Sequence, residues 1–358
     1  MNTMGSGLKT VVQPIFMALA GVFLGVLIAA IVGENPINIL SIMVSGVFGT
    51  PYDLGTAIYY MTILLFTGLA VAVPYRSGLF NIGAEGQLVI GGLCAAIFAL
   101  TFDHIVPSSM KLISVFAVSF LGGAAWGGIA GWIRAYRGGH EVISTIMLNF
   151  VAAGLSAWLT LNLFKSTDTQ IPETSMIDSS WMWPKIGNFD GAPVTLLTVI
   201  GLLIGVAVWF LMKRMNFGYL VSATAESEVA AEISGIETKF IRLLAMMIGG
   251  GFAGMAGGVM VLASTGRFRL DMGEGFGFAG IPVALLGKGD PIGVILSAGL
   301  FAFLQHGASA LDLEATYVNR DFAQVIQALV VLIVVSEKLF SRVYWKKIIF
   351  KLLPQAKG

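Results

Sequence analysis

Apolar runs, each about as long as a membrane is thick, recur along this chain of 358 residues. A helix needs about 20 apolar residues to cross the hydrocarbon core of a bilayer. The candidate spans are 11–32, 54–74, 80–102, 110–133, 142–164, 193–212, 240–263, 276–287, 291–311 and 322–340. Charged residues make up only 11% of the chain, against about 25% in soluble domains. The sequence therefore predicts an all-α polytopic membrane protein with about ten transmembrane helices, forming a single transmembrane domain over 1–358.

Two segments depart from the simple pattern of full-length helices. Segment 276–287 is short, and Gly273, Gly275, Gly277 and Gly280 crowd its start. Such a segment is typical of a half-length or broken helix that is buried in protein or lines a cavity. The stretch 36–50 is a candidate for a further helix at the membrane interface.

The basic residues predict an orientation, because cytoplasmic connections carry an excess of Lys and Arg. With the N-terminus inside, the inner connections hold Arg76, Arg134, Arg137, Lys213, Arg214, Lys239 and Lys288, and the C-terminal tail adds Lys338, Arg342, Lys346, Lys347 and Lys351. The outer connections hold only Lys165, Lys185, Arg267, Arg269 and Arg320. We therefore expect both termini in the cytoplasm, which requires an even number of spans.

Trp181 and Trp183 lie in the longest outer connection, 166–192. Trp at this depth commonly anchors a protein at the membrane interface. We expect that role here, with a docking surface for an outside partner as the alternative.

A Glu-Gly pair precedes a glycine-rich apolar helix at two places. The third span begins with FNIGAEGQLVIGG, which contains Glu85 and Gly86, and the eighth begins with GEGFGFAGIPVALLG (273–287), which contains Glu274 and Gly275. The two spans are five apart, so they point in opposite directions. An inverted repeat of spans 2–5 against spans 7–10 gives this arrangement, and transporters often build their path where such repeats meet.

Asn81, Glu85 and Gln87 stand at the start of the third span, where a charge is costly unless it is paired or hydrated. They either cap the helix start, with Arg76 as a charge partner for Glu85, or contact the solute or a gate. Asn149, inside the apolar run 142–164, either faces the path or bonds to a neighbouring helix.

Phe276 and Phe278, at the start of the broken eighth span, are candidates to stack on a flat base. Packing among other aromatic side chains in the core is the alternative for both rings. With Asn81, Glu85, Gln87 and Asn149, they complete the candidate residues for the translocation path or gate.

The connection 213–239 is the only long inner segment between spans. Ser227, Glu228 and the residues up to Glu232 predict a short helix that Gly235 ends. Its polar side is acidic, whereas helices that lie on lipid are rich in Lys and Arg. We therefore expect this helix to bind a protein partner.

Several kinds of chemistry lack their sequence signals. No GxxxxGK[ST] stretch is present to cradle a nucleotide phosphate, and no HExxH or GxSxG motif points to an enzyme. The three histidines and the one cysteine have no metal-ligand spacing. The net charge of +1 gives no reason to expect nucleic acid as a partner. No catalytic residue, metal or cofactor is expected in this chain.

Four stretches in order resemble the permease subunits of ABC importers. They are FNIGAEGQ (80–87), EVISTIMLNF (141–150), SATAESEVAAEISGI (222–236) and GFAGIPVALLGKGDPIGVILSA (277–298). The matching branch of this family carries branched-chain amino acids, ribose-type sugars and nucleosides. The residues of the four stretches are most similar to those of its nucleoside-type members. The resemblance extends over residues 55–335.

The resemblance implies a type II importer permease in a bacterial inner membrane. Its partners would be two cytoplasmic ATPases that hold ATP and Mg, a second permease that is identical or paralogous, and an extracytoplasmic substrate-binding lipoprotein. In that family the loop matching 213–239 contains a coupling helix that contacts the ATPase. The matching residues are Ala225, Glu226, Ser227, Glu228, Val229, Ala230, Ala231, Glu232, Gly235 and Ile236. This chain has Ala-Glu-Ser where the family often has Gly-Glu-Asn.

The expected function is therefore translocation of a nucleoside or a similar small polar solute. A path of small, apolar and amide groups suits a neutral polar solute. Riboflavin or a sugar is the alternative cargo within the same family. From other classes, a stand-alone secondary transporter or channel and a structural membrane subunit remain alternatives.

Overall fold

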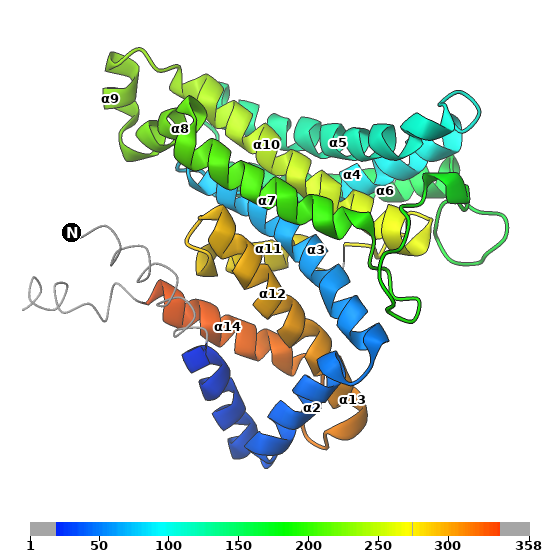
Figure 1. The fold of residues 1–358 in the computed structure, drawn as a ribbon. Coiled ribbons are helices and arrows are strands. Elements are labelled where there is room, and N and C mark those ends of the chain that lie inside the picture. The colour runs from blue at the N-terminus through cyan, green and yellow to red at the C-terminus, as the bar shows by residue number, and fades with distance from the viewer. Residues whose placement is uncertain (1–18, 274, 337–358) are drawn as a thin grey trace, which may run out of the picture. The chain divides into compact units, whose positions relative to one another are not determined.

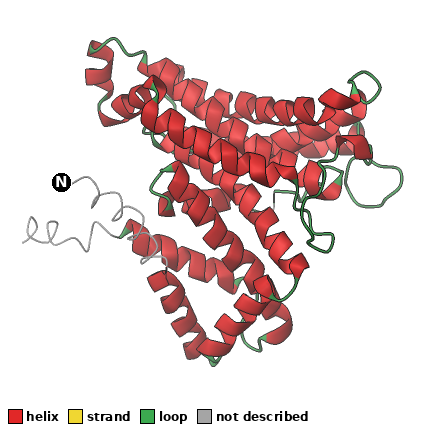
Figure 2. Cartoon of the chain, viewed as in Figure 1, coloured by secondary structure: helices red, strands yellow, loops and turns green. Residues whose placement is uncertain are grey.

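The computed structural model describes residues 19–273 and 275–336, and within them it contains helices and loops but no β-strand (Figure 2). This confirms the prediction of an all-α chain. Residues 11–18 of the first expected span, 337–340 of the last one, and Glu274 lie outside the described residues.

The helices follow the apolar runs of the sequence. They are Leu19–Val32, α2 (Pro36–Phe48), α3 (Pro51–Tyr75), α4 (Ala84–Thr101), α5 (Ser108–Arg137), α6 (Glu141–Asn162), α7 (Leu196–Arg214), α8 (Asn216–Glu226), α9 (Glu228–Ile233), α10 (Thr238–Val259), α11 (Phe276–Leu286), α12 (Pro291–Gly307), α13 (Leu311–Glu314) and α14 (Phe322–Val335). A π-helical turn, Met260–Thr265, continues α10, and short 3₁₀ turns lie at Ser179–Trp181 and Ala308–Ala310. Seven of the described helical segments are long and apolar enough to cross a membrane, and four shorter helices are apolar too.

The chain divides into two compact units. One contains the described residues 19–43 and 308–336, and the other contains 44–307. In the first unit, Gly21 and Gly25 let the segment Leu19–Val32 pack closely on Val330 and Ile326 of α14. The candidate residues for a path and for coupling all lie in the second unit.

The core of the second unit is built on close contacts between glycines of α4, α5 and α10. Gly91 and Gly92 of α4 lie against the backbone of Gly254 and Gly257, and Gly123 of α5 lies against Gly254 and the carbonyl of Gly250. Small residues allow such close approach of backbones in membrane helices, which lack a hydrophobic driving force between them. A Cβ at any of these positions would meet the backbone of a neighbouring helix.

Ser119 of α5 joins the same three helices by hydrogen bonds. Its hydroxyl lies 2.7 Å from the carbonyl of Gly254 and 3.2 Å from the carbonyl of Gly91. The residue is fully buried. Glycines that are scattered along the sequence of α4, α5 and α10 thus meet in one close-packed contact.

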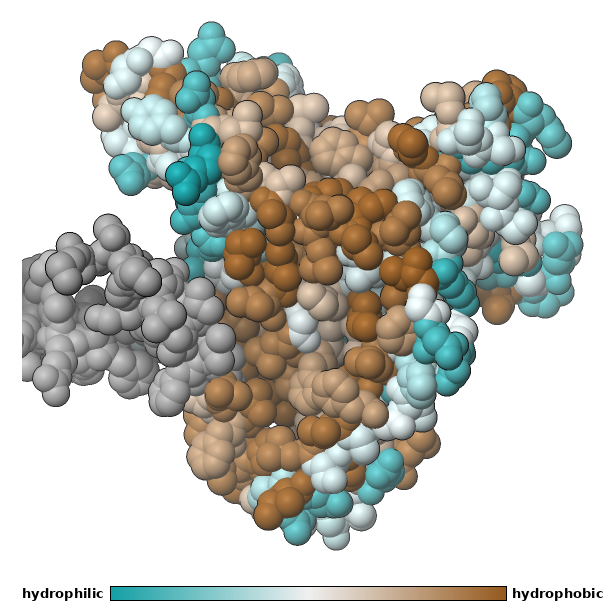
Figure 3. Space-filling view, viewed as in Figure 1, coloured by the Kyte–Doolittle hydropathy of each residue, from teal (hydrophilic) through white to brown (hydrophobic). Residues whose placement is uncertain are grey.

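The second unit has two polar ends. Figure 1 shows α8 and α9 at one end of α5, α7 and α10, and the long connection 163–195 at the other. We call these the α9 end and the loop end. Figure 3 shows an apolar surface over α7 between them, to which the exposed Leu203, Val206 and Phe210 belong. This apolar belt is the surface expected to face lipid.

The half-length helix α11 is confirmed, because it has only 11 residues. The turn that follows it is held at the α9 end. Lys213 of α7 makes an ion pair with Asp290 at 3.1 Å, and the Arg76 guanidinium lies 3.5 Å from the carbonyl of Gly289. At about 1.5 Å per residue, α11 begins about 16 Å from this end, and its start is therefore deep in the unit.

Candidate functional site

The starts of α4 and α11 meet in the interior of the second unit, and Glu85 joins them. Its carboxylate accepts the N–H of Gly277 at 2.8 Å and the N–H of Gly275 at 3.2 Å. The first N–H groups of a helix have no partner within the helix. Glu85 therefore caps α11, although its own position is in the first turn of α4.

The two helices leave this point in opposite directions. Asp103, just beyond the end of α4, bonds to Trp181 at the loop end, whereas α11 leads to the turn beside Arg76 at the α9 end. An inverted repeat of the two Glu-Gly segments predicts such an arrangement. The repeat of spans 2–5 against 7–10 as a whole stays a prediction.

The Arg76 partner expected for Glu85 is wrong. The Arg76 side chain lies beside Gly289, beyond the far end of α11. The sequence places Arg76 only nine residues before Glu85, but the intervening chain runs inward from the α9 end to the start of α4. Backbone N–H groups take the place of the cation.

Three glycines make the approach of α11 to Glu85 possible. A Cβ on Gly277 would meet the backbone of Glu85, and one on Gly273 would meet its carboxylate. Gly275 has φ +82°, a left-handed conformation that other residues adopt at a cost. The glycine-rich start of the eighth span is thus explained by one close contact.

Asn149 of α6 caps the start of α4. Its Oδ1 accepts the N–H of Gly86 at 2.9 Å, and its Nδ2 donates to the carbonyl of Ile82 at 3.0 Å. Both ends of the amide are bonded to the backbone of another helix. Of the two predicted roles, this geometry favours the bond to a neighbouring helix.

Asn81 and Gln87 form a closed pair of amides. Each donates an N–H to the other, at 2.9 and 3.1 Å, and Asn81 also bonds the carbonyl of Ala70 and the N–H of Gly83, both at 3.0 Å. Both residues are buried. The pair ties the turn before α4 to α3, and its predicted role as a cap or gate stays a prediction.

Phe276 and Phe278 occupy different surroundings. Phe276 is 3% exposed, and its ring packs on Tyr60 with the centroids 5.3 Å apart. Phe278 is 45% exposed. Of the two rings only Phe278 is exposed, while Phe276 takes the alternative of aromatic packing.

The α9 segment shows how a short helix is fixed by its ends. Ser227 is the N-cap, and its hydroxyl accepts the N–H of Ala230 at 3.3 Å. Gly235 follows the helix with φ +83°, and the N–H of Ile236 returns to the carbonyl of Ala231 at 3.0 Å. The predicted short helix ended by Gly235 is confirmed, and α8 ahead of it is an addition that the sequence did not predict.

Two acidic residues of α9 bind it to α10 instead of facing a partner. Glu228 makes an ion pair with Arg242 at 2.7 Å, and the Thr238 hydroxyl donates to Glu232 at 2.8 Å. Val229 and Ile233 are 68% and 83% exposed. The helix is therefore held firmly while its apolar side chains point outward.

The remaining residues of the predicted coupling segment surround α9. Ala225 and Glu226 end α8, and the backbone of Ala225 lies beside the turn at Gly78. Ala230 is exposed, and Ala231 is buried on the inner side. One side of the segment therefore packs against the rest of the unit, and the other side is exposed.

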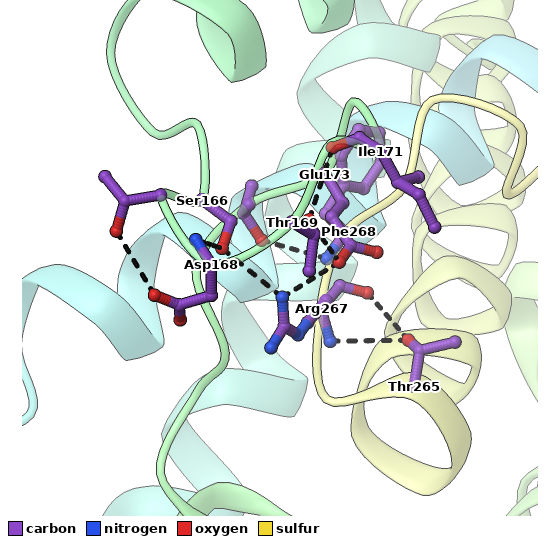
Figure 4. Close-up of polar contacts among 10 residues, drawn as sticks. Ser166, Asp168, Thr169, Ile171, Glu173, Thr265, Arg267 and Phe268 are labelled. Atoms are coloured by element: carbon purple, nitrogen blue, oxygen red, sulfur yellow. Dashed lines mark hydrogen bonds and ion pairs between the residues drawn. The ribbon is translucent and has the colours of Figure 1, made fainter.

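The loop end contains a partly buried ion pair that the sequence did not predict. Figure 4 shows Arg267 between Ser166 and Glu173, with its Nη1 2.8 Å from the Glu173 carboxylate and 3.3 Å from the Ser166 hydroxyl. Beside it, the Thr174 N–H donates to the Phe268 carbonyl, and the Phe268 N–H donates to the Thr174 hydroxyl. The pair attaches the long connection 163–195 to the segment that links α10 to α11.

Trp181 and Trp183 are buried, which contradicts the expected anchoring at the membrane interface. The Trp181 indole donates to Asp103 at 2.6 Å, and Lys111 lies 2.6 Å from the same carboxylate and over the indole ring. These bonds from Lys111 and Trp181 hold the pKa of Asp103 below its usual range. The polar partners lie far away in the sequence, so the sequence could not reveal this role.

These arrangements define a capped meeting point of α4 with the half-length α11, and a predicted coupling segment with one exposed side. Among the described residues, no group of three or more His, Cys, Asp and Glu side chains is placed to hold a metal ion. The interior polar groups of α4 and α11 bond to the chain itself.

Comparison with known proteins places the chain in a transport family. Residues 53–335 match the family model described as "Branched-chain amino acid transport system / permease component". The guanosine ABC transporter permease protein NupP of Bacillus subtilis is 31% identical over 92% of this chain and 94% of its own length. The nucleoside ABC transporter permease protein NupB of Lactococcus lactis is 28% identical over 99% and 96%.

A third relative differs in its named cargo. The glucose ABC transporter permease protein TsgB13 of Haloferax volcanii is 29% identical over 92% of this chain and 88% of its own length. No solved structure matches the chain closely enough to count as similar. The family match covers most of the chain and includes every candidate residue described above, so this protein belongs to the family of permease components of the branched-chain amino acid transport system.

Proposed function

We propose that this permease subunit of an ABC importer carries a nucleoside or a similar small polar solute across a bacterial inner membrane. The proposal for the cargo rests on two relatives whose names give guanosine and nucleosides. A sugar is the second candidate, because a relative of similar identity is named for glucose. Riboflavin stays an alternative from the sequence resemblance alone.

The observation that carries the proposed mechanism is the exposed apolar side of α9. Val229 and Ile233 protrude from a helix that ion pairing and capping fix on α10. A rigid helix with exposed apolar residues suits docking into a partner, since apolar burial stabilises association. We assign the partner as an ATPase subunit that binds ATP and Mg, and the segment Ala225–Ile236 as the coupling element.

The α9 end then faces the cytoplasm, with both chain termini on the same side, and the loop end receives a substrate-binding lipoprotein. A second permease subunit completes the path. The chain performs no ATP hydrolysis itself. Because α10 follows α9 in the chain and contacts α4 at Gly91 and Gly92, movement of the ATPases would reach α4 through α10.

The test uses the complete importer, reconstituted into vesicles with its ATPases and binding protein. Substituting Ser at both Val229 and Ile233 should lower ATP-driven uptake at least about tenfold, since each exposed anchor contributes more than about 1 kcal/mol to docking. The matched control replaces Leu203 and Val206, exposed residues of the apolar belt on α7, by Ser. Normal uptake by the α9 variant, with the ATPase still bound, would refute the coupling role.

The cargo is tested separately with the unaltered importer. Nucleosides, riboflavin and sugars are added in turn, and ATP hydrolysis is measured. We expect the largest stimulation by a nucleoside. Stimulation by glucose alone would replace the nucleoside proposal with the sugar one.

A further inference from the structure

Part of the long connection crosses the loop end between two attachments. This part is residues 173–184, which we call the strap. The connection joins α6, which packs on α4 and α5, to α7, which packs on α3 and α12. The strap itself is bound to the end of α10 and to the junction of α4 with α5. These two attachments differ in the kind of bond that they use.

The attachment to α10 is made mainly by the backbone. Three strap N–H groups donate to carbonyls of the segment 262–268, from Thr174 to Phe268, from Ile177 to Gly266 and from Trp183 to Leu262, at 2.9, 2.9 and 3.1 Å. The partly buried Glu173–Arg267 ion pair adds a side-chain bond at the start of the strap (Figure 4). The strap is thus fastened to this segment along most of its length.

The π-helical turn at the end of α10 supplies one of these acceptors. In an α-helix the Leu262 carbonyl would accept the N–H of Gly266, four residues later. In this turn the Gly266 N–H bonds instead to Val261, five residues back, at 2.9 Å. The Leu262 carbonyl is therefore available to the strap. The irregular end of α10 and the strap form one hydrogen-bonded body.

The attachment to α4 and α5 is made by side chains. The Trp181 indole donates to Asp103, which follows α4, at 2.6 Å. Lys111 of α5 lies 2.6 Å from the same carboxylate and 2.9 Å from the Ser180 hydroxyl. We call these four residues the latch. They lie between Ile177 and Trp183, so the strap is bonded to α10 on both sides of them.

The latch is the contact that separates more easily. The Asp103 side chain is 30% exposed, so water can replace the bonds that break when the latch opens. Ion pairs that are largely removed from water contribute little net stability, because lost hydration offsets the attraction between the charges. A division of the loop end should therefore run through the latch and leave the strap on α10.

We propose that the strap is a conformational device that stays bound to α10 while the latch opens and closes in each transport cycle. The proposal deepens the proposed function and rests on it. The start of α10 is bound to α9 through the Glu228–Arg242 ion pair. Movement at the α9 end then reaches the loop end as movement of the strap away from the junction of α4 with α5.

The experiment uses the complete importer in vesicles, with Cys94→Ala as the reference because Cys94 is the only cysteine of this chain. Lys111→Cys with Ser180→Cys places one thiol on each side of the latch, and a short bis-methanethiosulfonate reagent joins them. Uptake should fall at least about tenfold, because the cross-link holds nearly all molecules in the closed state. Reduction should restore it. Each single variant receives the same reagent as a control.

The matched cross-link lies between the strap and the segment after α10. Glu173 and Arg269 face each other in an isolated antiparallel bridge, where the Cα atoms are about 4.5–5.5 Å apart, as a disulfide requires. The disulfide formed by Glu173→Cys with Arg269→Cys should leave uptake unchanged. Normal uptake with the latch cross-linked, or loss of uptake with this disulfide, would overturn the proposal.

Should the cysteine variants fail to fold, the unaltered importer still decides. During ATP hydrolysis, peptides covering 179–182 should exchange their amide hydrogens faster than at rest. The N–H groups of Thr174 and Ile177 should keep their protection. Equal exchange in the two states, or loss of protection over the whole strap, would overturn the proposal.

Failure of the latch is distinguishable from failure of the proposed function. Each cross-link is compared with its own reduced form on the same vesicles, with an unaltered α9. Normal uptake by the Val229 and Ile233 variant would reject coupling at α9 and leave this comparison unchanged. Absence of ATP-driven uptake in the unaltered importer, before any cross-link, would reject the proposed function itself.

Discussion

The meeting point of α4 and α11 and the short helix α9 both use helix caps, but with opposite results for the surface. At the meeting point, Glu85, Asn149 and the Asn81–Gln87 pair all bond to the backbone or to each other. At α9, the polar residues bond to α10, and the apolar Val229 and Ile233 are left exposed.

This difference separates two uses of polar side chains. In the interior, an unbonded N–H or carbonyl is costly, so helices that start inside the unit need caps from neighbouring helices. At the α9 end water can satisfy such groups, and the caps instead fix the direction of the exposed apolar residues. Substitutions at the meeting point should therefore change folding, whereas substitutions on α9 should change coupling.

The largest expected effect is that of Gly277→Ala. The new methyl group would collide with the backbone of Glu85, and overpacking against backbone costs about 3 kcal/mol. The free energy of unfolding, measured by denaturant titration in nanodiscs, should fall by this amount. Gly154→Ala in α6 is the matched control, because a Cβ there meets no atom within 4 Å; an equal loss in both variants would contradict the close contact.

A smaller loss is expected from Asn149→Leu. The change leaves the N–H of Gly86 and the carbonyl of Ile82 without partners, at about 2 kcal/mol together. Asn162→Leu, at the exposed end of the same helix, should cost much less. Unfolding under the same conditions compares the two, and a stable Asn149→Leu protein would show that the cap on α4 is dispensable.

The smallest change in stability is expected at the ion pair between Glu228 and Arg242. Glu228 is partly exposed, and surface pairs contribute about 0–1 kcal/mol. Glu228→Gln should therefore unfold almost as the unaltered chain does, yet lower the amount of solute carried per ATP hydrolysed, because α9 loses its fixed direction. Uptake and hydrolysis measured on the same vesicles give this ratio, and an unchanged ratio would restrict coupling to the apolar residues.

The sequence predicted those parts of the fold that depend on local composition. Long apolar runs gave the seven long helices, the crowded glycines gave the half-length α11, and Ser227 with Gly235 gave the bounds of α9. Each of these signals lies within a few residues of the structure that it specifies, because helix formation and capping are local.

The partners of the polar residues could not be predicted in the same way. A cap at the start of α4 was expected, but the helix that Glu85 caps lies 190 residues further along. The nearest cation in the sequence, Arg76, proved to lie elsewhere. The buried Trp181 likewise depends on Asp103, far along the chain. Such pairs follow from the packing of distant segments, which a single sequence does not reveal.

Trp181 and Glu173 attach the long connection 163–195 to the rest of the unit, but these two contacts do not include the turn at 185–192. Between Lys185 and Ala192 the chain turns through Asp190 and Gly191, both exposed, and the described contacts of this turn include a hydrogen bond from the Lys185 ammonium to the Gly191 carbonyl. An epitope inserted there should be tolerated. Antibody access to that epitope in intact cells would report which side of the membrane the loop end faces, and would do so without altering any residue that the proposed mechanism uses.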